Sequence, residues 1–258
     1  MEVRDRIASW EILLETALPA FNGRVLCVQS CSSTMELARS QITTQPSLTL
    51  AANQTAGRGR QGRVWLAAHQ GMYATIALPY RGEVSRLSGL SLMIGCVVQQ
   101  VLAERGCHTL VKWPNDLLDR GDRKLAGILI EVEKVESHFC ILIGIGINIS
   151  EAPLSEGVAL YDLCGKTFAP YDLLSWIVNS MSPDWELFCR EGFKPFVSRW
   201  QSVAAWIGRR VELHNAHSVV EGKFSGVDSE GRIEILSERG VDRFAAGDLV
   251  LSSRSLEN

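Results

Sequence analysis

The stretch that decides the fold is TLVKWPNDLLDRGDRKLAGILIEVEKVESHFCILIGIGINI, residues 109–149. It contains three strand-like segments, Thr109–Trp113, Lys124–Val132 and Phe139–Ile149, which are joined by short polar links. Strands joined this directly pair antiparallel. We therefore predict an antiparallel meander here. With helical segments on both sides of it, the meander indicates an α+β fold with a mixed, largely antiparallel sheet.

Upstream of the meander, apolar spacing predicts a leading helix that ends before Pro19 and a buried helix over Leu87–Leu102. Ser33 and Glu36 form a capping-box pattern that is expected to open a short helix, Met35–Ser40. Further strands are predicted at Arg24–Gln29, Ser47–Ala52 and Gly71–Pro79.

Downstream of the meander, Tyr171–Trp200 is predicted to be helical, with breaks near Pro183 and Pro195. After Trp206 the pattern changes to short strands separated by Gly and Asp. These strands predict a small β-barrel-like module of about fifty residues. We expect a larger domain over residues 1–206 and a terminal domain over residues 207–258.

The composition limits the classes of function. With 26 Lys and Arg against 29 Asp and Glu, the net charge of −3 gives no overall positive field, so we expect no nucleic-acid partner. The seven cysteines are scattered and include no CxxC pair, which argues against a disulfide framework and a structural zinc site. Apolar stretches such as Phe139–Ile149 are too short to span a membrane. No secretory signal is visible, and the expected compartment is the cytoplasm.

The segment Gly57-Arg58-Gly59-Arg60-Gln61-Gly62-Arg63 alternates glycine with arginine. It matches the letters of a dinucleotide fingerprint, but the following stretch, Val64–Pro79, is strand-like where that fold needs a helix. The Walker pattern fails as well, because Leu160 stands where Gly165-Lys166-Thr167 needs its leading glycine. A solvated charged turn remains an alternative. Glycines that let the backbone approach a ligand, and arginines that grip oxygen pairs, favour a phosphate or acyl-phosphate lid.

A second cluster, Lys112-Trp113-Pro114-Asn115-Asp116, ends one predicted strand, and Lys124 begins the next. If those two strands pair as a hairpin, both lysines project near one end of the sheet. For each lysine the alternative is a surface side chain, and for Asn115-Asp116 it is turn chemistry.

Together these segments resemble the biotin–protein ligase (biotin–[acetyl-CoA carboxylase] ligase) family. The matching motifs, in chain order, are Ser33-Thr34, Gln54 followed by Gly57–Trp65, Lys112–Asp116, Lys124–Gly127 and Gly144–Asn148. They follow the family's order and spacing from about Arg24 to the terminal module. The resemblance implies a catalytic domain like that of lipoate ligases and class II aminoacyl-tRNA synthetases, followed by a small SH3-like β-barrel.

The resemblance also implies a site that binds biotin and ATP as substrates. Its biotin-binding residues are Ser33, Thr34, Gln54, Arg58, Gly59, Arg60, Lys124, Gly127 and Gly144. Its ATP-binding residues are Arg60, Arg63, Trp65, Lys112, Asn115 and Asn148. The residues implied to carry the chemistry are Lys112, Lys124, Asp116 and Arg58. For Trp65 and Trp113, a place in the core is an equal alternative.

Two departures from the family pattern stand out. Met35 occupies the place of an asparagine, which removes an amide from the expected biotin pocket. Fewer than thirty residues precede the first matching strand, too few for the N-terminal DNA-binding domain that some members carry. A repressor role is therefore not expected.

The activity implied is attack of the biotin carboxylate on ATP, then transfer of biotin to a lysine of a biotin carboxyl carrier protein. The first step brings together anions, so Mg²⁺ and fixed cations are expected, although the sequence assigns no metal ligands. Asp116 is the candidate to help the incoming amine lose its proton, and Gly57–Arg63 is expected to close over the intermediate. The rivals are a lipoate or octanoate ligase and a non-catalytic biotin-binding protein. The chain is expected to be a monomer or a homodimer, with a sheet edge open to a carrier or a second copy.

Overall fold

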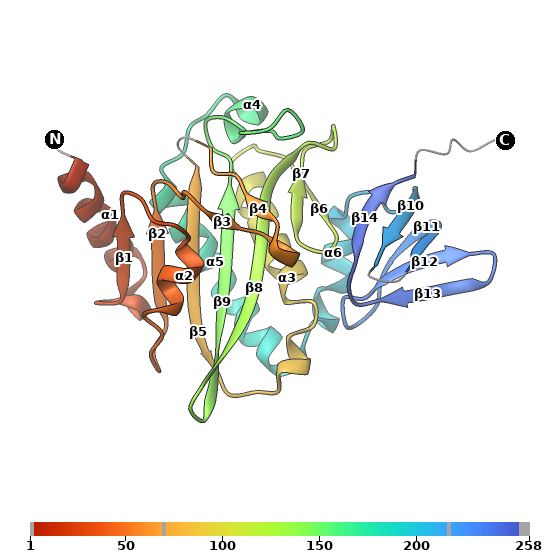
Figure 1. The fold of residues 1–258 in the computed structure, drawn as a ribbon, viewed down its shortest axis with the longest axis horizontal. Coiled ribbons are helices and arrows are strands. Elements are labelled where there is room, and N and C mark those ends of the chain that lie inside the picture. Colours follow the sequence, from red (N-terminus) through yellow and green to blue (C-terminus); the bar gives the residue numbers. More distant parts are fainter. Residues whose placement is uncertain (1–2, 69–70, 216–217, 253–258) are drawn as a thin grey trace.

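A computed structural model describes residues 3–68, 71–215 and 218–252. Its centre is a seven-stranded sheet in the order β1-β2-β5-β9-β8-β7-β6 (Figure 1). The strands are β1 (Val25–Val28), β2 (Ser47–Ala51), β5 (Met72–Tyr80), β6 (Leu110–Lys112), β7 (Asp116–Leu118), β8 (Lys124–Val135) and β9 (His138–Ile147). Only β1 and β2 run parallel, so the sheet is mixed and largely antiparallel as predicted.

The predicted meander is confirmed with one correction. Lys112 and Lys124 do not lie on paired strands, because the short strand β7 is inserted between β6 and β8. Turn chemistry was the alternative for Asn115-Asp116, and it does not hold for Asp116, which begins this strand. Strands β8 and β9 then pair from Ala126 opposite Ile147 to Val135 opposite His138.

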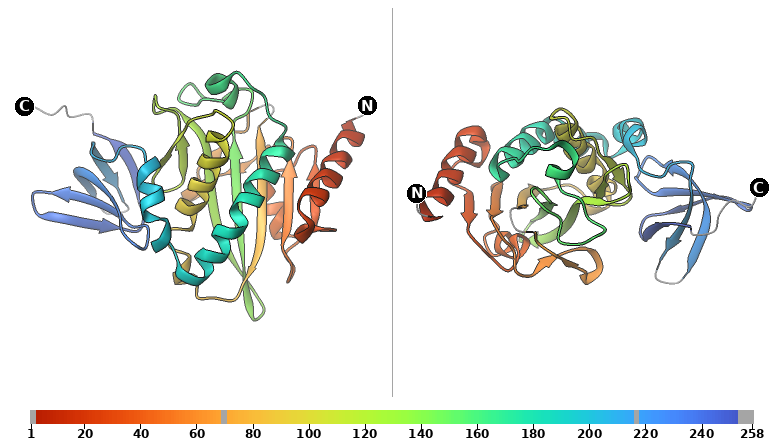
Figure 2. Two further views of the ribbon diagram at one scale, coloured as in Figure 1. Left: turned by 180° about the vertical axis from the view of Figure 1, so that it is seen from behind. Right: turned by 90° about the horizontal axis from the view of Figure 1, so that it is seen from above.

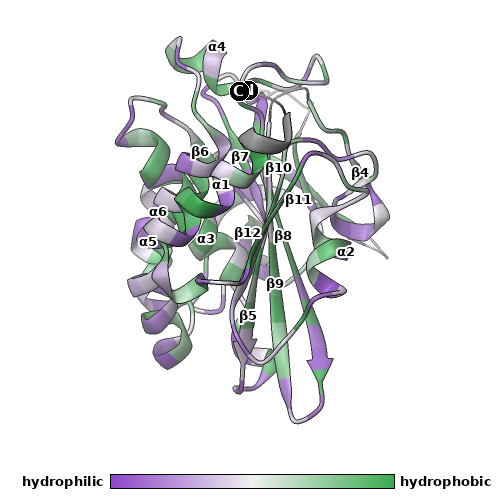
Figure 3. Cartoon of the chain, turned by 90° about the vertical axis from the view of Figure 1, so that its left-hand side faces the viewer, coloured by the Kyte–Doolittle hydropathy of each residue, from purple (hydrophilic) through white to green (hydrophobic). Residues whose placement is uncertain are grey.

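Helices cover one face of the sheet. Helix α3 (Leu90–Ala103) packs against it together with α5 (Pro170–Glu191), and α6 (Val197–Val203) follows (Figure 2). Most side chains of helix α3 are apolar and buried, since the helix lies between the sheet and α5 (Figure 3). The short helix α2 (Thr34–Arg39) packs against β2, β5 and β9 on the other face (Figure 1). The smaller elements are η1 (Pro19–Phe21), β3 (Gly57–Arg58), η2 (Arg60–Gly62), β4 (Val64–Trp65), η3 (Val84–Leu87), α4 (Leu160–Cys164) and η4 (Lys194–Phe196).

Three local expectations were wrong. Ser33 precedes α2 but its side chain makes no capping hydrogen bond, so the capping box is absent. Helix α5 continues through Pro183, because its buried apolar face outweighs the hydrogen bond that a proline removes. Cys107 and Cys164 form a disulfide, although the scattered cysteines had predicted none.

The expectation that the apolar stretches are too short to cross a membrane is wrong for Val84–Ala103, which is long and apolar enough by length and composition. In the fold this segment includes the core helix α3, and its apolar side chains are largely buried within the protein.

The chain after Trp206 forms a separate five-stranded antiparallel sheet in the order β13-β12-β11-β10-β14. Its strands are β10 (Arg210–His214), β11 (Val219–Val227), β12 (Ile233–Ser237), β13 (Gly240–Phe244) and β14 (Asp248–Leu251). In the described part of the chain β13 does not pair with β14, so this sheet is open rather than a closed barrel. Trp113 joins it to the larger sheet, because the buried indole N–H donates to the carbonyl of Gly231 at 3.0 Å.

Both outer edges of the large sheet are covered. Helix α1 (Val3–Ala17) lies along β1, and the Glu11 carboxylate accepts the Cys27 backbone N–H at 2.8 Å. At the other edge, the Ala205 N–H donates to the Val111 carbonyl at 2.9 Å. The outer strands β1 and β6 therefore do not offer the open sheet edge that was expected for a carrier or a second copy.

Glu11 should stabilise the fold more than Glu15, four residues along the same helix. The bond that Glu11 accepts is partly buried, whereas Glu15 accepts the exposed N–H of Gly23 at 2.8 Å. Glu11→Ala leaves a strand N–H without its partner and should lower the free energy of unfolding by about 1–2 kcal/mol. Glu15→Ala, the matched control, should cost less than about 0.5 kcal/mol. Urea denaturation measures both, and equal losses would contradict the edge role of Glu11.

Candidate active site

The site is a cavity of about 160 Å³ on the face of the sheet that carries α2. Its floor is made by glycines on adjacent strands: Gly127 of β8 lies opposite Gly146 of β9, and Gly144 follows the same face. A Cβ atom at Gly127 or Gly146 would lie 2.8 Å from the Trp65 ring, and one at Gly144 would lie 2.8 Å from the Met35 sulfur. The missing side chains therefore let Trp65 and Met35 lie directly against the sheet.

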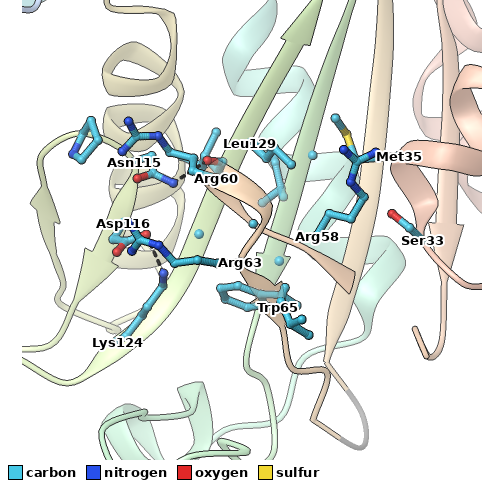
Figure 4. Close-up of a pocket in the computed structure, with 18 of the residues that line it drawn as sticks. Ser33, Met35, Arg58, Arg60, Arg63, Trp65, Asn115, Asp116, Lys124 and Leu129 are labelled. Carbon is cyan, nitrogen blue, oxygen red and sulfur yellow. Dashed lines mark hydrogen bonds and ion pairs between the residues drawn. The ribbon is translucent and has the colours of Figure 1, made fainter. Parts of the chain in front are cut away.

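The structure shows which of the two tryptophans, Trp65 or Trp113, belongs to the site and which to the core. Trp65 lines the cavity, over the glycine floor (Figure 4). Trp113 borders the same cavity but is only 1% exposed, so it is chiefly a core residue.

One end of the cavity is lined by hydrogen-bonded, uncharged polar side chains, and Arg58 lies beside them. Gln54 Oε1 accepts the Thr34 backbone N–H at 2.7 Å and the Thr34 hydroxyl at 3.1 Å. The Thr34 hydroxyl in turn accepts a hydrogen bond from Thr75 at 2.9 Å. Ser33 Oγ is buried without a hydrogen-bond partner in the described residues, an arrangement that costs about 1–3 kcal/mol unless a ligand satisfies it. Thr75 was missed; its only signal is a hydroxyl inside the apolar strand MYATIALPY.

Arg58 lies on the same side as Ser33 and Met35 (Figure 4). Its guanidinium is 3.8 Å from a Glu36 oxygen and 3.5 Å from a Glu131 oxygen. Arg39 shares this acidic group through ion pairs with Glu131 and Glu133. Arg58 is thus held beside the cavity by carboxylates from α2 and β8.

The basic glycine segment is an ordered hairpin, in which β3 pairs with β4 and the Gly59 N–H donates to the Arg63 carbonyl at 2.8 Å. Gln61 at its tip has a φ of 54°, a left-handed conformation that few side chains adopt. Arg60 is half-buried, which lowers its pKa, and it donates to the Gly247 carbonyl at 3.4 Å. Arg63 forms an ion pair with Asp248. The terminal sheet therefore anchors two of the three arginines.

Both lysines lie on one side of the cavity, although their strands do not pair as the hairpin on which that prediction rested. Lys124 forms an ion pair with Asp116 at 2.7 Å, and its Nζ lies 5.2 Å from the Trp65 ring centre (Figure 4). Lys112 has its pKa lowered, chiefly because burial disfavours the charged form. The cavity thus concentrates cations opposite the neutral polar end.

The two asparagines differ in position. Asn115 lines the cavity, and its side chain donates to the Ile128 carbonyl at 2.8 Å. Asn148 is only 3% exposed and donates to the Val158 carbonyl at 3.2 Å, so it lies outside the residues that line the cavity. Asp248 lines the cavity but was missed, because it lies in the terminal module far from every recognised motif.

No group of three or more His, Cys, Asp or Glu side chains suited to a metal ion occurs among residues 3–68, 71–215 and 218–252. The acidic groups at the cavity, Asp116 and Asp248, are each paired with a cation.

Comparison with known proteins agrees with this geometry. The sequence profile of the biotin/lipoate A/B protein ligase family matches residues 25–148. A Mycobacterium tuberculosis protein named biotin–[acetyl-CoA-carboxylase] ligase is 37% identical over 217 residues, covering 78% of this chain and 77% of the relative. The chain therefore belongs to the biotin/lipoate A/B protein ligase family.

Two further proteins are similar to this chain, one in sequence and one in structure. The bifunctional ligase/repressor BirA of Escherichia coli is 32% identical over 212 residues, or 79% of this chain, and the alignment spans 66% of BirA. The solved structure of the Aquifex aeolicus biotin protein ligase, in complex with biotin and ATP, superposes with a TM-score of 0.77 at 27% identity, covering 89% of this chain and 98% of the other.

The ion pair between Arg63 and Asp248 predicts a pH-dependent contribution to stability. Arg63 lowers the pKa of Asp248 by hydrogen bonding to its carboxylate. A lowered pKa stabilises the fold above the ordinary Asp value of about 3.9, and this stabilisation is lost as the pH falls through the lower, folded-state value. Because Arg63 is more than half exposed, Asp248→Asn should cost only about 0.5 kcal/mol at pH 7.

The difference between the parent and Asp248→Asn should disappear in strong acid. Denaturation from pH 2 to pH 7 measures it. Asp242→Asn is the control, because Asp242 is exposed on the same sheet and has no ion pair among the described residues. A loss that does not change with pH would contradict the assignment.

Proposed function

We propose that this protein uses ATP to convert biotin into biotinyl-5′-AMP and then transfers biotin to a lysine of a biotin carboxyl carrier protein. One observation carries the proposal: a single cavity joins a neutral, hydrogen-bonding end to a cationic end across a glycine floor. The names of the relatives and the biotin and ATP bound in the Aquifex aeolicus structure support it.

The neutral end suits biotin. Its ureido ring presents both N–H donors and a carbonyl acceptor, which Ser33 Oγ and the Thr34–Gln54 pair can complement. At this end, the buried Met35 presents an apolar side chain where the family pattern has an asparagine amide. We propose that biotin contacts these residues together with Arg58, Gly59, Arg60, Gly127 and Gly144, and that its carboxylate points toward Lys124.

The cationic end suits the nucleotide. Lys112, Arg60 and Arg63 supply positive charge for the phosphates, and Asn115 and the Trp65 ring complete this end. Asn148 is proposed to act indirectly. Its amide is 3.5 Å from the carbonyl of Lys124, so it helps to position the end of the strand that carries this lysine.

The first step forms a bond from a biotin carboxylate oxygen to the α-phosphorus and releases pyrophosphate. It brings an anion against a polyanion, so fixed cations lower its barrier. Mg²⁺ is proposed to enter as part of MgATP, since this ion retains much of its water and takes phosphate oxygens as ligands. The hairpin Gly57–Arg63 would shield the mixed anhydride from water, held at one side by Asp248.

In the second step the carrier lysine attacks the acyl carbonyl, AMP leaves, and the amine loses a proton. Asp116 is the proposed acceptor of that proton, and in the free enzyme its carboxylate is bound to Lys124. Asp116→Asn should therefore slow transfer to the carrier by about 100-fold, while adenylate formation, which loses only the positioning of Lys124, should fall by about 10-fold or less.

Single-turnover measurement of each half-reaction separates these effects. Glu156→Gln is a control, because that carboxylate lies outside the cavity lining. Equal losses in both half-reactions of Asp116→Asn would remove Asp116 from the transfer step.

Partners and organisation complete the proposal. The larger unit, residues 1–206, would hold both substrates, and residues 207–258 would form an SH3-like module, in keeping with its five antiparallel strands. Beyond Leu129, β8 pairs with β9 on one side only in the described chain, so this stretch can accept a strand from the carrier or from a second copy. We propose a monomer or a homodimer, since the β8 edge could pair with a second copy. The proposed compartment is the cytoplasm, where ATP is available as a substrate.

A biotin-dependent ATP–pyrophosphate exchange assay tests the proposal, with lipoate and octanoate run in parallel. Exchange should require biotin, and the other two acids should give at most a few per cent of that rate because the neutral end is built for a ureido ring. Exchange supported equally by lipoate or octanoate would assign the protein to the other branch of its family. No exchange with any acid would overturn an adenylating function.

A further inference from the structure

The ammonium of Lys112 lies over an aromatic ring that is not part of the cavity. Its Nζ is 4.7 Å from the ring centre of Trp206, in the connection between α6 and β10. Resting on the function proposed above, we infer that Trp206 is a positioning residue for the adenylation step: its π face holds the Lys112 ammonium charged and directed into the cavity.

Trp206 is held in place by an unusual local structure. Its φ is 68°, a left-handed conformation that is exceptional for a bulky residue, and its partner Asp122 has a φ of 65°. The indole N–H donates to the Asp122 carboxylate, and Arg209 lies 3.3 Å from the other oxygen of the same carboxylate. Such backbone strain persists only where surrounding contacts fix it.

The connection is also fixed to the strand that carries Lys112. The Ala205 N–H donates to the Val111 carbonyl at 2.9 Å, and Ala204 bridges to Val111. Trp206 directly follows Ala205, and Lys112 directly follows Val111. The hydrogen bond between Ala205 and Val111 therefore holds the two side chains near each other. Any displacement of the connection would move the ring away from the ammonium.

The two lysines of the site differ in what balances their charge. Lys124 has both the Asp116 carboxylate at 2.7 Å and the Trp65 ring at 5.2 Å. Within the described chain, Lys112 has no carboxylate within ion-pair distance, and the ring of Trp206 is the contact shown for its ammonium. An ammonium within about 6 Å of an indole face is attracted to it, and more strongly where water is excluded.

This contact should also set the pH range of activity. The charged groups that act on Lys112 are Asp116 and Asp248, which favour its charged form, and Lys124 and Arg63, which oppose it. A ring over the ammonium favours the charged form as well. Removing the ring lowers the pKa of Lys112, so the alkaline limb of the exchange rate should move to lower pH.

A matched pair of substitutions isolates the π face. Trp206→Phe and Trp206→Leu both lose the bond to Asp122 and both place a side chain at the same φ, but only Phe keeps a ring. In biotin-dependent exchange, the Phe variant should remain within about 3-fold of the parent, whereas the Leu variant should lose about 5- to 30-fold in kcat. In the Leu variant, the alkaline limb of the pH–rate profile should shift to lower pH by about 0.5–1 unit, and the KM for biotin should change little.

Trp176→Leu is the control, because it removes a similar contact far from the cavity, the Arg105 guanidinium 3.6 Å from the Trp176 ring. Its rate and pH profile should match those of the parent. Equal rates and equal alkaline limbs in the Phe and Leu variants would overturn the role of Trp206. Absence of exchange in the parent chain would instead overturn the proposed function.

If thermal unfolding shows that either Trp206 variant is not folded, fluorinated tryptophans at position 206 decide the question. Fluorine weakens the negative face of the ring while nearly preserving its shape. Exchange should then decrease stepwise from tryptophan to the mono-, di- and trifluoro forms. A rate that does not change along this series would overturn the inference.

Discussion

The contact between the Trp65 ring and the cross-strand glycines Gly127 and Gly146 governs the architecture of the site. A single methyl group at either glycine would lie 2.8 Å from the ring. Because these glycines are partners on β8 and β9, the sheet has a gap in its side-chain layer where the indole lies. Trp65 belongs to the second strand of the hairpin that carries Arg58, Arg60 and Arg63, so the packing of this one ring also positions the arginines at the cavity.

The second constraint is electrostatic. Several cations surround a small cavity, and each is held by a partner drawn from a different part of the chain: Arg58 by Glu36 and Glu131, Arg63 by Asp248, Lys124 by Asp116. Among the described residues, neither Lys112 nor Arg60 has such an ion pair: Lys112 lies against the Trp206 ring, and Arg60 donates to the Gly247 carbonyl. Dispersed partners keep like charges close together without an anion present, so the site is organised before an anionic substrate arrives.

The local sequence pattern predicted some elements of the fold and missed others. Long strands and helices such as β8, β9 and α3 were predictable, since alternation and apolar spacing reflect one buried face. The three-residue strand β7 was hidden within a turn-like sequence that is too short to show a period. Helix α5 contains Pro183, and there tertiary burial outweighed local propensity. The Ser33 hydroxyl was expected to cap α2, but it lies at the cavity without a hydrogen-bond partner among the described residues.

The sequence by itself determined the α+β class, and it indicated the glycine-arginine segment and the two lysines as candidates, because each signal lies in residues close together along the chain. Only the tertiary structure decided what acts on those groups. Asp248 reaches Arg63 from 185 residues away, Trp206 lies over Lys112, and Thr75 joins the Thr34–Gln54 pair. It also excluded Asn148 from the cavity lining. Contacts between distant segments depend on how the two sheets pack together, and no local spacing encodes that packing.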